Sequence, residues 1–317
     1  MWFLLLASLQ ANPIVNGQLE SGFPAVVALG AELPTGPLSA CTGTLIAPRV
    51  VLSAAHCKEG LPVDELLVET LAFFGPSVYD PDQLIGIEEM ILHPDYRPQD
   101  AFNLARNDVA VLILREDASA EATWFRSEEV TAADVGTEVT SVGFGVTSSH
   151  AGDEGTKRSA QISVDDLNDE FILVLHDNNP TNSNLCNGDS GGPMYHYDVE
   201  SDRYIQWAIH SYADLDCSSK SGSTRTDLFK DWILDQVEAE HGTRDICAAN
   251  EWYDDGVCDD LCDEVDPDCL FAEGDTGSEE DEAQPKGSGG CSVLPVGRPV
   301  LGFSVLLLGI GRRRKLG

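Results

Sequence analysis

The sequence predicts an all-β domain, a barrel or a sandwich, up to about residue 240, with one helix at its end. Short runs rich in Val, Ile, Leu and Thr recur along this part, and clusters of Gly, Pro, Asp or Ser separate many of them. Such runs and separators are typical of β-strands and turns. The runs are FPAVVALG, TGTLIAP, RVVLSAA, DVAVLIL, TEVTSVGFG, FILVLH and RYIQWAIHSY.

A single helix is expected over TDLFKDWILDQVEAEH, residues 226–241. Five of its side chains fall on one helical face, and Gly242 follows as a stop signal. The β domain is therefore expected to end at residue 242, and it starts at residue 14, after the signal and pro-segment described below. The five side chains on the shared face are Leu228, Trp232, Ile233, Gln236 and Val237.

Composition limits the range of functions. The 317 residues include 42% hydrophobic residues, enough for a sizeable core, and the formal net charge is -35. A chain this acidic is a poor partner for nucleic acid, and an anionic membrane surface would repel most of it. We interpret the charge as a solvated acidic surface.

The chain begins with MWFLLLASLQANP, a short apolar run followed by small residues. This pattern predicts a secretory signal peptide and a short pro-segment over residues 1–13. Secretion agrees with the nine cysteines, which form four pairs with one left over in an oxidising compartment.

The composition changes after residue 242. Residues 245–282 hold sixteen acidic and no basic side chains, with four cysteines in CAANEWYDDGVCDDLCDEVDPDC. We expect Cys247, Cys258, Cys262 and Cys269 to hold together an acidic module over residues 243–270, followed by a disordered linker over residues 271–290. Three roles stay open for the module: a disulfide-bonded spacer, a Ca²⁺ site built from its carboxylates, or a surface for a protein partner.

Three separated motifs carry the chemistry of the β domain: VLSAAHC, RNDVAVLIL and CNGDSGGPM. In this order, at spacings of 52 and 82 residues, they resemble the trypsin-like (chymotrypsin-fold) serine endopeptidases from Ile14 to about Glu240. The resemblance implies two antiparallel β-barrels with the active site in the cleft between them. It also implies a triad of His56, Asp108 and Ser190, protein or peptide substrates, and no required cofactor or metal.

The residue types suit this chemistry. A serine hydroxyl is a weak nucleophile until an imidazole accepts its proton, and the imidazole needs a carboxylate that fixes its tautomer. Ser190 would attack, His56 would carry the proton and Asp108 would orient His56. The resemblance places the oxyanion hole at the backbone N–H groups of Gly188 and Ser190.

The resemblance also implies activation and two disulfides. Ile14, in IVNG, matches the mature N-terminus, whose amino group pairs with the carboxylate of Asp189 after cleavage by an activating peptidase. The implied disulfides join Cys41 to Cys57 and Cys186 to Cys217. Ser211 matches the serine that supports the buried aspartate and helps to bind substrate.

The primary specificity pocket departs from trypsin. Its floor falls on Asn184, where trypsin has an aspartate, and its walls fall on Ala213 and Gly222. These residues predict a preference for an uncharged side chain before the scissile bond, rather than Arg or Lys. Two other departures, Phe144 for a tryptophan and Thr42 for a glycine, leave the chemistry unchanged.

The C-terminal segment 291–317 resembles the sorting signal of myxobacterial surface proteins, the MYXO-CTERM tag. It combines Cys291 after a Gly-rich linker, an apolar stretch from Ser292 to Gly311, and a basic cluster from Arg312 to Lys315 that should stay cytoplasmic. The resemblance implies cleavage and lipid attachment at Cys291 by a sorting machinery, and tethering to the bacterial outer membrane. The alternative is a simple membrane anchor in which Cys291 has no role.

The predicted function is thus a secreted, surface-tethered serine endopeptidase. A competing hypothesis is a catalytically silent, protease-like surface protein that binds ligand through its acidic module.

Overall fold

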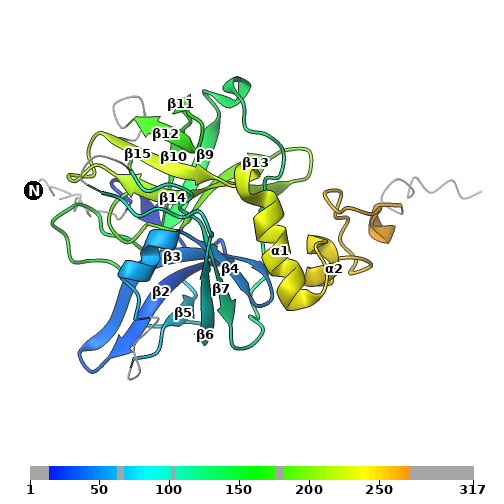
Figure 1. Ribbon diagram of the computed structural model, residues 1–317, viewed down its shortest axis with the longest axis horizontal. Helices are drawn as coiled ribbons and strands as arrows, with labels where there is room; N and C mark the ends of the chain where they lie inside the picture. The colour runs from blue at the N-terminus through cyan, green and yellow to red at the C-terminus, as the bar shows by residue number, and fades with distance from the viewer. Residues whose placement is uncertain (1–13, 63–67, 101–103, 176–181, 271–317) are drawn as a thin grey trace, which may run out of the picture. The chain divides into compact units, whose positions relative to one another are not determined.

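The computed structural model describes residues 14–62, 68–100, 104–175 and 182–270. The expected signal segment 1–13, the linker 271–290 and the tail with Cys291 lie outside these residues. The described part is mainly β-structure arranged in two halves, with two helices beside them (Figure 1).

The first half is a closed six-stranded antiparallel barrel. Its order is β2-β3-β4-β7-β6-β5, and β5 closes the ring by pairing with β2. The apolar runs of the sequence form its core because β4 and β7 are buried at every position. The strands are β2 Val26–Leu33, β3 Gly36–Ala47, β4 Val50–Ser53, β5 Leu71–Phe74, β6 Gln83–Leu92 and β7 Ala110–Leu114.

The second half is a nine-stranded sheet. Its path runs β1-β10-β9-β13-β14-β15-β12-β11, and β8 pairs in parallel with β14. Within the described residues this path does not close into the second barrel that the resemblance implies. Its strands are β1 Gln18–Leu19, β8 Trp124–Phe125, β9 Glu138–Gly143, β10 Arg158–Ser163, β11 Asp166–Leu167, β12 Phe171–Leu175, β13 Pro193–Asp198, β14 Arg203–Ala213 and β15 Lys220–Arg225.

The expected helix forms as α1 Lys230–His241, after a 3-10 turn at Asp227–Phe229. Gly242 ends it with φ 75°, and its N–H donates to the Glu238 carbonyl at 2.8 Å. Ile233 and Val237, on the predicted shared face, are buried, whereas Leu228 lies in the 3-10 turn before the helix and is 46% exposed.

The acidic cysteine segment packs on both halves of the β structure. Its short helix α2 Ile246–Asn250 lies next to α1 (Figure 1), and Trp252 contacts Trp124 with 4.8 Å between ring centroids. Ile246, Cys247, Ala249 and Trp252 share one apolar core with barrel residues. Arg203 on β14 forms an ion pair with the buried Asp259. The segment is therefore continuous with the β domain in its packing.

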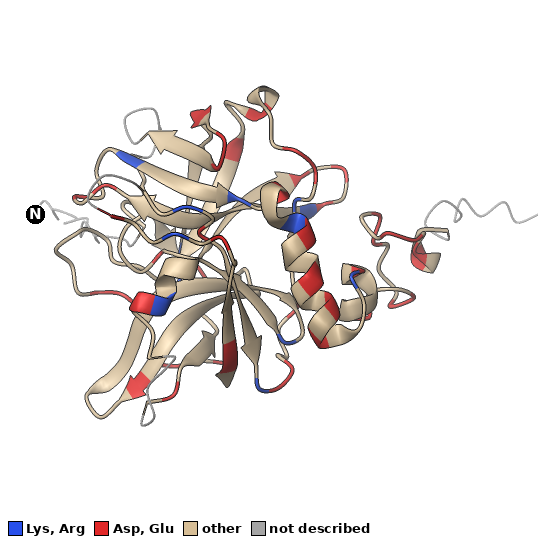
Figure 2. Ribbon diagram, in the orientation of Figure 1, with Lys and Arg blue, Asp and Glu red and all other residues tan. Residues whose placement is uncertain are grey.

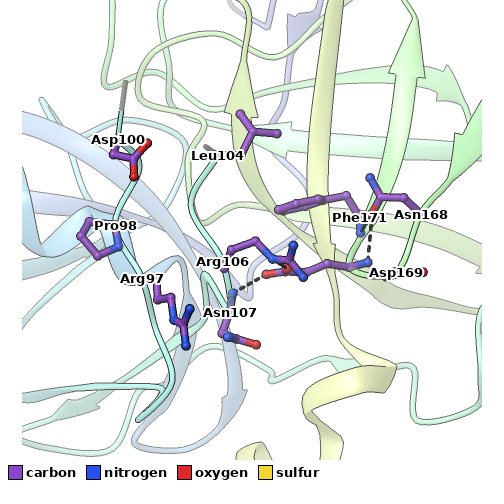
Figure 3. A pocket seen from close by; sticks show the side chains of 10 residues that line it. Arg97, Pro98, Asp100, Leu104, Arg106, Asn107, Asn168, Asp169 and Phe171 are labelled. Atoms are coloured by element: carbon purple, nitrogen blue, oxygen red, sulfur yellow. Dashed lines mark hydrogen bonds and ion pairs between the residues drawn. The ribbon is translucent and has the colours of Figure 1, made fainter. Parts of the chain in front are cut away.

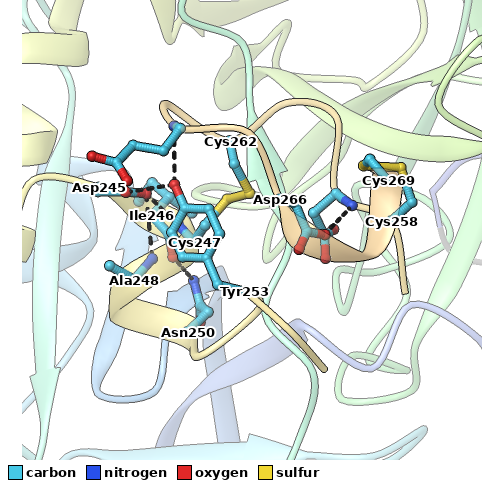
Figure 4. The surroundings of a disulfide bond; sticks show 12 residues. Asp245, Ile246, Cys247, Ala248, Asn250, Tyr253, Cys258, Cys262, Asp266 and Cys269 are labelled. Carbon is cyan, nitrogen blue, oxygen red and sulfur yellow. Dashed lines mark hydrogen bonds between the residues drawn. A yellow bond between two sulfur atoms is a disulfide. The ribbon is translucent and has the colours of Figure 1, made fainter. Parts of the chain in front are cut away.

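Two disulfides hold this segment, Cys247–Cys262 and Cys258–Cys269 (Figure 4). Its carboxylates turn toward backbone amides: Asp266 accepts from the N–H groups of Asp254, Asp259 and Asp268. A ready-made Ca²⁺ site would instead direct several free oxygens at one point. These contacts do not fit such a cage, and calcium plays no part in the function proposed below.

Acidic residues are spread over both halves and along α1, as Figure 2 shows. This distribution accompanies the formal net charge of -35. None of the helices in the described ranges has the length and apolar composition needed to cross a bilayer.

Candidate active site

Asp108 lies at the centre of the site, fully buried just before β7. One of its oxygens, Oδ2, is 2.8 Å from His56 Nδ1 and accepts a 2.6 Å hydrogen bond from Ser211 Oγ. The other, Oδ1, accepts the backbone N–H of His56 at 2.9 Å. The 3-10 turn Ala55–Glu59, directly after β4, carries His56 to this position. The ring and the backbone of His56 are thus both fixed by one carboxylate.

The electrostatics suit an imidazole that accepts a proton. Burial by itself lowers the pKa of His56, but the hydrogen bond and charge of Asp108, together with the charge of Glu59, outweigh it. The pKa therefore lies above its ordinary value. Asp108 would therefore stabilise the imidazolium that forms when His56 accepts the proton of the serine.

The loop that carries Ser190 is hydrogen-bonded to β3 of the first barrel and to β14 of the second sheet. The Ser190 carbonyl accepts the N–H of Thr42 at 2.8 Å, and the N–H of Gly191 donates to the His210 carbonyl at 2.8 Å. Gly191 has φ +83°, and a Cβ there would lie 2.0 Å from Ser53 Oγ, so only glycine fits. Within the described residues no hydrogen bond joins Ser190 Oγ to His56. Such bonds often form only when substrate is bound.

Both disulfides expected in the β domain are present, Cys41–Cys57 and Cys186–Cys217. The first lies next to His56, and Cys57 Sγ is 3.6 Å from the Ser190 carbonyl oxygen. Cys41, His56 and Cys57 cluster closely enough to suggest a metal site. Their sulfurs are bonded to each other, however, so no thiolate is left to bind a metal.

Asp189 is fully buried beneath the nucleophile loop. Its carboxylate accepts the N–H groups of Gly145 and Cys186, each at 2.9 Å. Burial raises the pKa of Asp189 to about 7, although these hydrogen bonds and Arg158 favour the charged form. Gly143 makes room for the group, since a Cβ there would lie 2.2 Å from Asp189 Oδ1.

The segment that begins at Ile14 lies beside this loop. Ile14 is completely buried, and Val15 and Asn184 exchange backbone hydrogen bonds of 2.9 and 3.3 Å. In this uncleaved chain the nitrogen of Ile14 belongs to the peptide bond with Pro13. It therefore offers no positive charge to Asp189.

Comparison with known proteins shows to which family the chain belongs. The family model described as Trypsin matches residues 17–233, more than half of the chain. The chain belongs to the trypsin family. It is a serine endopeptidase of that family, and its relatives are named as proteases of this kind.

Three relatives show the extent of the similarity. The chain is 25% identical to CLIP domain-containing serine protease HP8 of Bombyx mori over 270 residues, 74% of this chain and 72% of the relative. It is 27% identical to CLIP domain-containing serine protease B10 of Anopheles gambiae over 231 residues, 62% of this chain and 61% of the relative. It is also 27% identical to chymase of Mus musculus over 243 residues, 73% and 93% of the two chains.

Thr42 has a larger role in this trypsin-family site than its sequence position suggested. Its hydroxyl donates to the Gly188 carbonyl at 2.9 Å and accepts the Phe144 N–H at 3.1 Å. Its own carbonyl accepts Ser53 Oγ at 2.8 Å. One side chain thus holds the Gly188–Asp189 peptide, which directly follows the Gly188 N–H, the proposed oxyanion donor.

Replacing Thr42 with Val should therefore lower kcat by about tenfold, with little change in KM, because the Gly188–Asp189 peptide, next to the oxyanion donor, loses a hydrogen bond that positions it. Thr42→Ser keeps the hydroxyl and should restore most of kcat. Steady-state kinetics on one peptide substrate tests this. Equal kcat for the Val and Ser variants would refute the role.

The strand register bears on the predicted pocket walls, Ala213 and Gly222. Strand register pairs Ala213 with Ser221, whereas Gly222 pairs with Tyr212. A Cβ on Gly222 would lie 2.3 Å from the Tyr212 ring, so the phenol covers that position. Because cross-strand partners share a face of the sheet, Ser221 rather than Gly222 accompanies Ala213. A register shift between His210 and Tyr212 changes the alignment by one residue.

A cavity of about 940 Å³ borders the residue that precedes Asp108 (Figure 3). There the buried Glu170 accepts the backbone N–H of Asn107 and forms an ion pair with Arg106. Glu170 thereby connects the start of β12 to the loop that carries Asp108. We interpret Glu170 as a residue that positions this loop.

Proposed function

We propose that this trypsin-family enzyme hydrolyses peptide bonds of protein substrates through His56, Asp108 and Ser190. The observation that carries the proposal is the contact of the Asp108 carboxylate with both the ring and the backbone of His56. That geometry selects the tautomer with a proton on Nδ1, which leaves Nε2 free to accept the proton of a serine.

The reaction then proceeds in two stages. Ser190 Oγ attacks the scissile carbonyl as its proton passes to His56, and the N–H groups of Gly188 and Ser190 stabilise the oxyanion. His56 returns the proton to the leaving amine, which departs and leaves an acyl-enzyme. Water, deprotonated by His56, releases the second product and regenerates Ser190.

Activation is proposed to follow cleavage before Ile14 by another peptidase. A free amino group at Ile14 would supply an ion-pair partner for the buried Asp189, whose charged form is favoured in the uncleaved chain by the charge of Arg158 and by two backbone hydrogen bonds. The pair would hold the 186–190 loop, and with it the oxyanion hole, in its working conformation.

Specificity is proposed to favour an uncharged side chain before the scissile bond. Asn184 at the pocket floor is fully buried and carries no charge. A buried Lys or Arg side chain would need a carboxylate in its place.

We further propose secretion and tethering to the bacterial outer membrane through the tail that follows the linker 271–290. The disulfides fit an oxidising compartment. The tail resemblance favours processing and lipidation at Cys291, and stable anchoring needs more than one acyl chain.

An active-site-directed fluorophosphonate tests the catalytic proposal. The cleaved protein should be labelled covalently, and Ser190→Ala should abolish the label. A wild-type protein that resists labelling after cleavage before Ile14 would favour the silent binding protein instead.

For the tail, mature protein extracted from the cell surface should end at or near Cys291, lack the basic cluster and carry lipid on that residue. Cys291→Ser should remain active but be unprocessed or released. Intact-mass analysis measures this. An unmodified chain that reaches Gly317 would support the plain anchor.

A further inference from the structure

Three polar atoms beside the proposed specificity pocket are buried without a hydrogen-bond partner among the described residues. They are Asn184 Oδ1, His210 Nε2 and Ser221 Oγ. All three residues are at most 1% exposed. Buried polar groups are normally paired, so three unpaired ones on the segments that carry the proposed pocket point to a ligand that pairs them.

Strand register places two of these residues on one face of the β14–β15 pair. Ala213 opposes Ser221 and His210 opposes Ser223, whereas Tyr212 and Gly222 form the intervening pair. Because side chains alternate along a strand, Ser221 and Ser223 point to the same side. The face that carries Ala213 is therefore lined with hydrogen-bonding groups and is not apolar.

The amide of Asn184 has a defined orientation. Its Nδ2 lies 3.5 Å from Asp214 Oδ1. Partial burial raises the pKa of Asp214, but the hydrogen bonds from Ser218, Ser219 and Lys220 outweigh it and keep the group ionised. With its NH₂ group directed at this carboxylate, Asn184 is left with its carbonyl oxygen as an unpaired acceptor.

His210 adds a neutral group. Its Nδ1 lies 3.1 Å from Ser223 Oγ, and burial lowers the pKa of the imidazole to about 3 although the Pro193 carbonyl favours the charged form. At neutral pH the ring carries no charge with which to pair an acidic side chain. When Ser223 donates to Nδ1, the unpaired Nε2 carries the proton and is a donor.

We propose that Asn184, Ser221 and His210 select a substrate with a carboxamide side chain, glutamine or asparagine, before the scissile bond. The proposal rests on the pocket assignment made above and narrows its uncharged preference to one chemical class. The substrate NH₂ group donates to Asn184 Oδ1, and its carbonyl accepts from Ser221 or His210.

Other side chains suit this set of atoms less well. An apolar side chain leaves the three buried atoms unpaired, which costs transition-state binding. A carboxylate brings a negative charge toward the Asn184 oxygen and the ionised Asp214, and it offers no donor. A basic side chain finds no carboxylate except Asp214, which is already hydrogen-bonded to three backbone amides and to Asn184.

The test uses the cleaved full-length enzyme and one peptide in which the residue before the scissile bond is Gln, Glu, Met or Arg. Gln, Glu and Met are close in size, so their comparison isolates hydrogen bonding and charge. We expect kcat/KM for Gln to exceed each of the others by about tenfold or more. Preference for Met, Glu or Arg would overturn the proposal.

Matched variants assign the effect to the residues. Asn184→Leu should bring the Gln-to-Met ratio close to one, and Ser221→Ala should lower it severalfold. Thr224→Val is the control: Thr224 is a buried residue of the same strand with an unpaired hydroxyl, but it points to the opposite face. The Gln-to-Met ratio of Thr224→Val should match that of the wild-type enzyme. A ratio unchanged in both Asn184→Leu and Ser221→Ala would also overturn the proposal.

Fluorophosphonate labelling of Ser190 in every sample distinguishes a failure of the carboxamide pocket from a failure of the endopeptidase function. Labelled enzyme without a Gln preference refutes the carboxamide pocket and leaves the endopeptidase function intact. Wild-type protein that neither labels nor cleaves refutes both.

Discussion

Ser190→Ala and His56→Ala should each lower kcat for peptide hydrolysis by about 10⁴- to 10⁶-fold. The loss is large because the serine and the imidazole act as one unit: without His56 the serine keeps its proton, and without Ser190 there is no nucleophile. Residual hydrolysis would come from substrate binding and the oxyanion donors alone. Stopped assays with long incubation on a fluorogenic peptide measure rates this low.

Ser39→Ala is a suitable control for these variants. Ser39 is a buried serine on β3 of the first barrel. Its hydroxyl has no partner within the described ranges, and it lies outside the proposed catalytic machinery. Its turnover should stay near wild type. If Ser190→Ala matched Ser39→Ala in rate, the assignment of the nucleophile would be wrong.

Protein that remains extended before Ile14 should have kcat/KM about 10²- to 10³-fold below the cleaved enzyme, the range expected when an oxyanion donor is displaced. In the uncleaved chain Asp189 has two backbone donors but no cationic amino group. Asp189→Asn should be similarly weak after cleavage, because a neutral amide gives the new amino group no partner. Full activity of the extended protein would contradict the activation proposal.

The same carboxyl predicts a pH effect on stability before cleavage. Burial raises the pKa of Asp189 from 3.8 to about 7, so between these values the folded chain binds more protons than the unfolded chain. The free energy of unfolding should therefore fall as pH rises from about 4 to 7, by up to about 4 kcal/mol. Urea titrations at pH 5 and pH 7.5 measure the fall. Asp189→Asn should flatten this dependence in the uncleaved chain, and an equal slope in both proteins would exclude Asp189 as its source.

The catalytic motifs were predictable from sequence because each is local. The residues that surround His56, Asp108 and Ser190 are adjacent to them in the chain, and the three motifs together, in their order and spacing, resemble one family. The role of Thr42 was not predictable, since its hydroxyl contacts Gly188 and Phe144, which lie 146 and 102 residues away. The expectation that a threonine at this position leaves the chemistry unchanged takes no account of those contacts, and it stays a prediction.

The pocket illustrates a second limit. The resemblance places the pocket walls at Ala213 and Gly222, whereas the pairing of β14 with β15 sets Ser221 opposite Ala213. A shift in register at Tyr212 produces the difference, and such a shift leaves no mark in composition or periodicity. The helix shows the reverse case: α1 forms as its apolar spacing predicts, and only its first turn differs.

The packing of Trp252 on Trp124 has a practical consequence for anyone who trims this protein. A fragment that stops at Gly242, where the predicted β domain ends, would expose Trp124 and its neighbours in the apolar core to water. The Arg203 guanidinium would lose its partner Asp259. Recombinant protein cut there should aggregate or express poorly. Protein that ends after Leu270 retains the two disulfides of the acidic segment and the side chains that cover the apolar core. The smallest soluble form of the enzyme therefore includes the acidic segment.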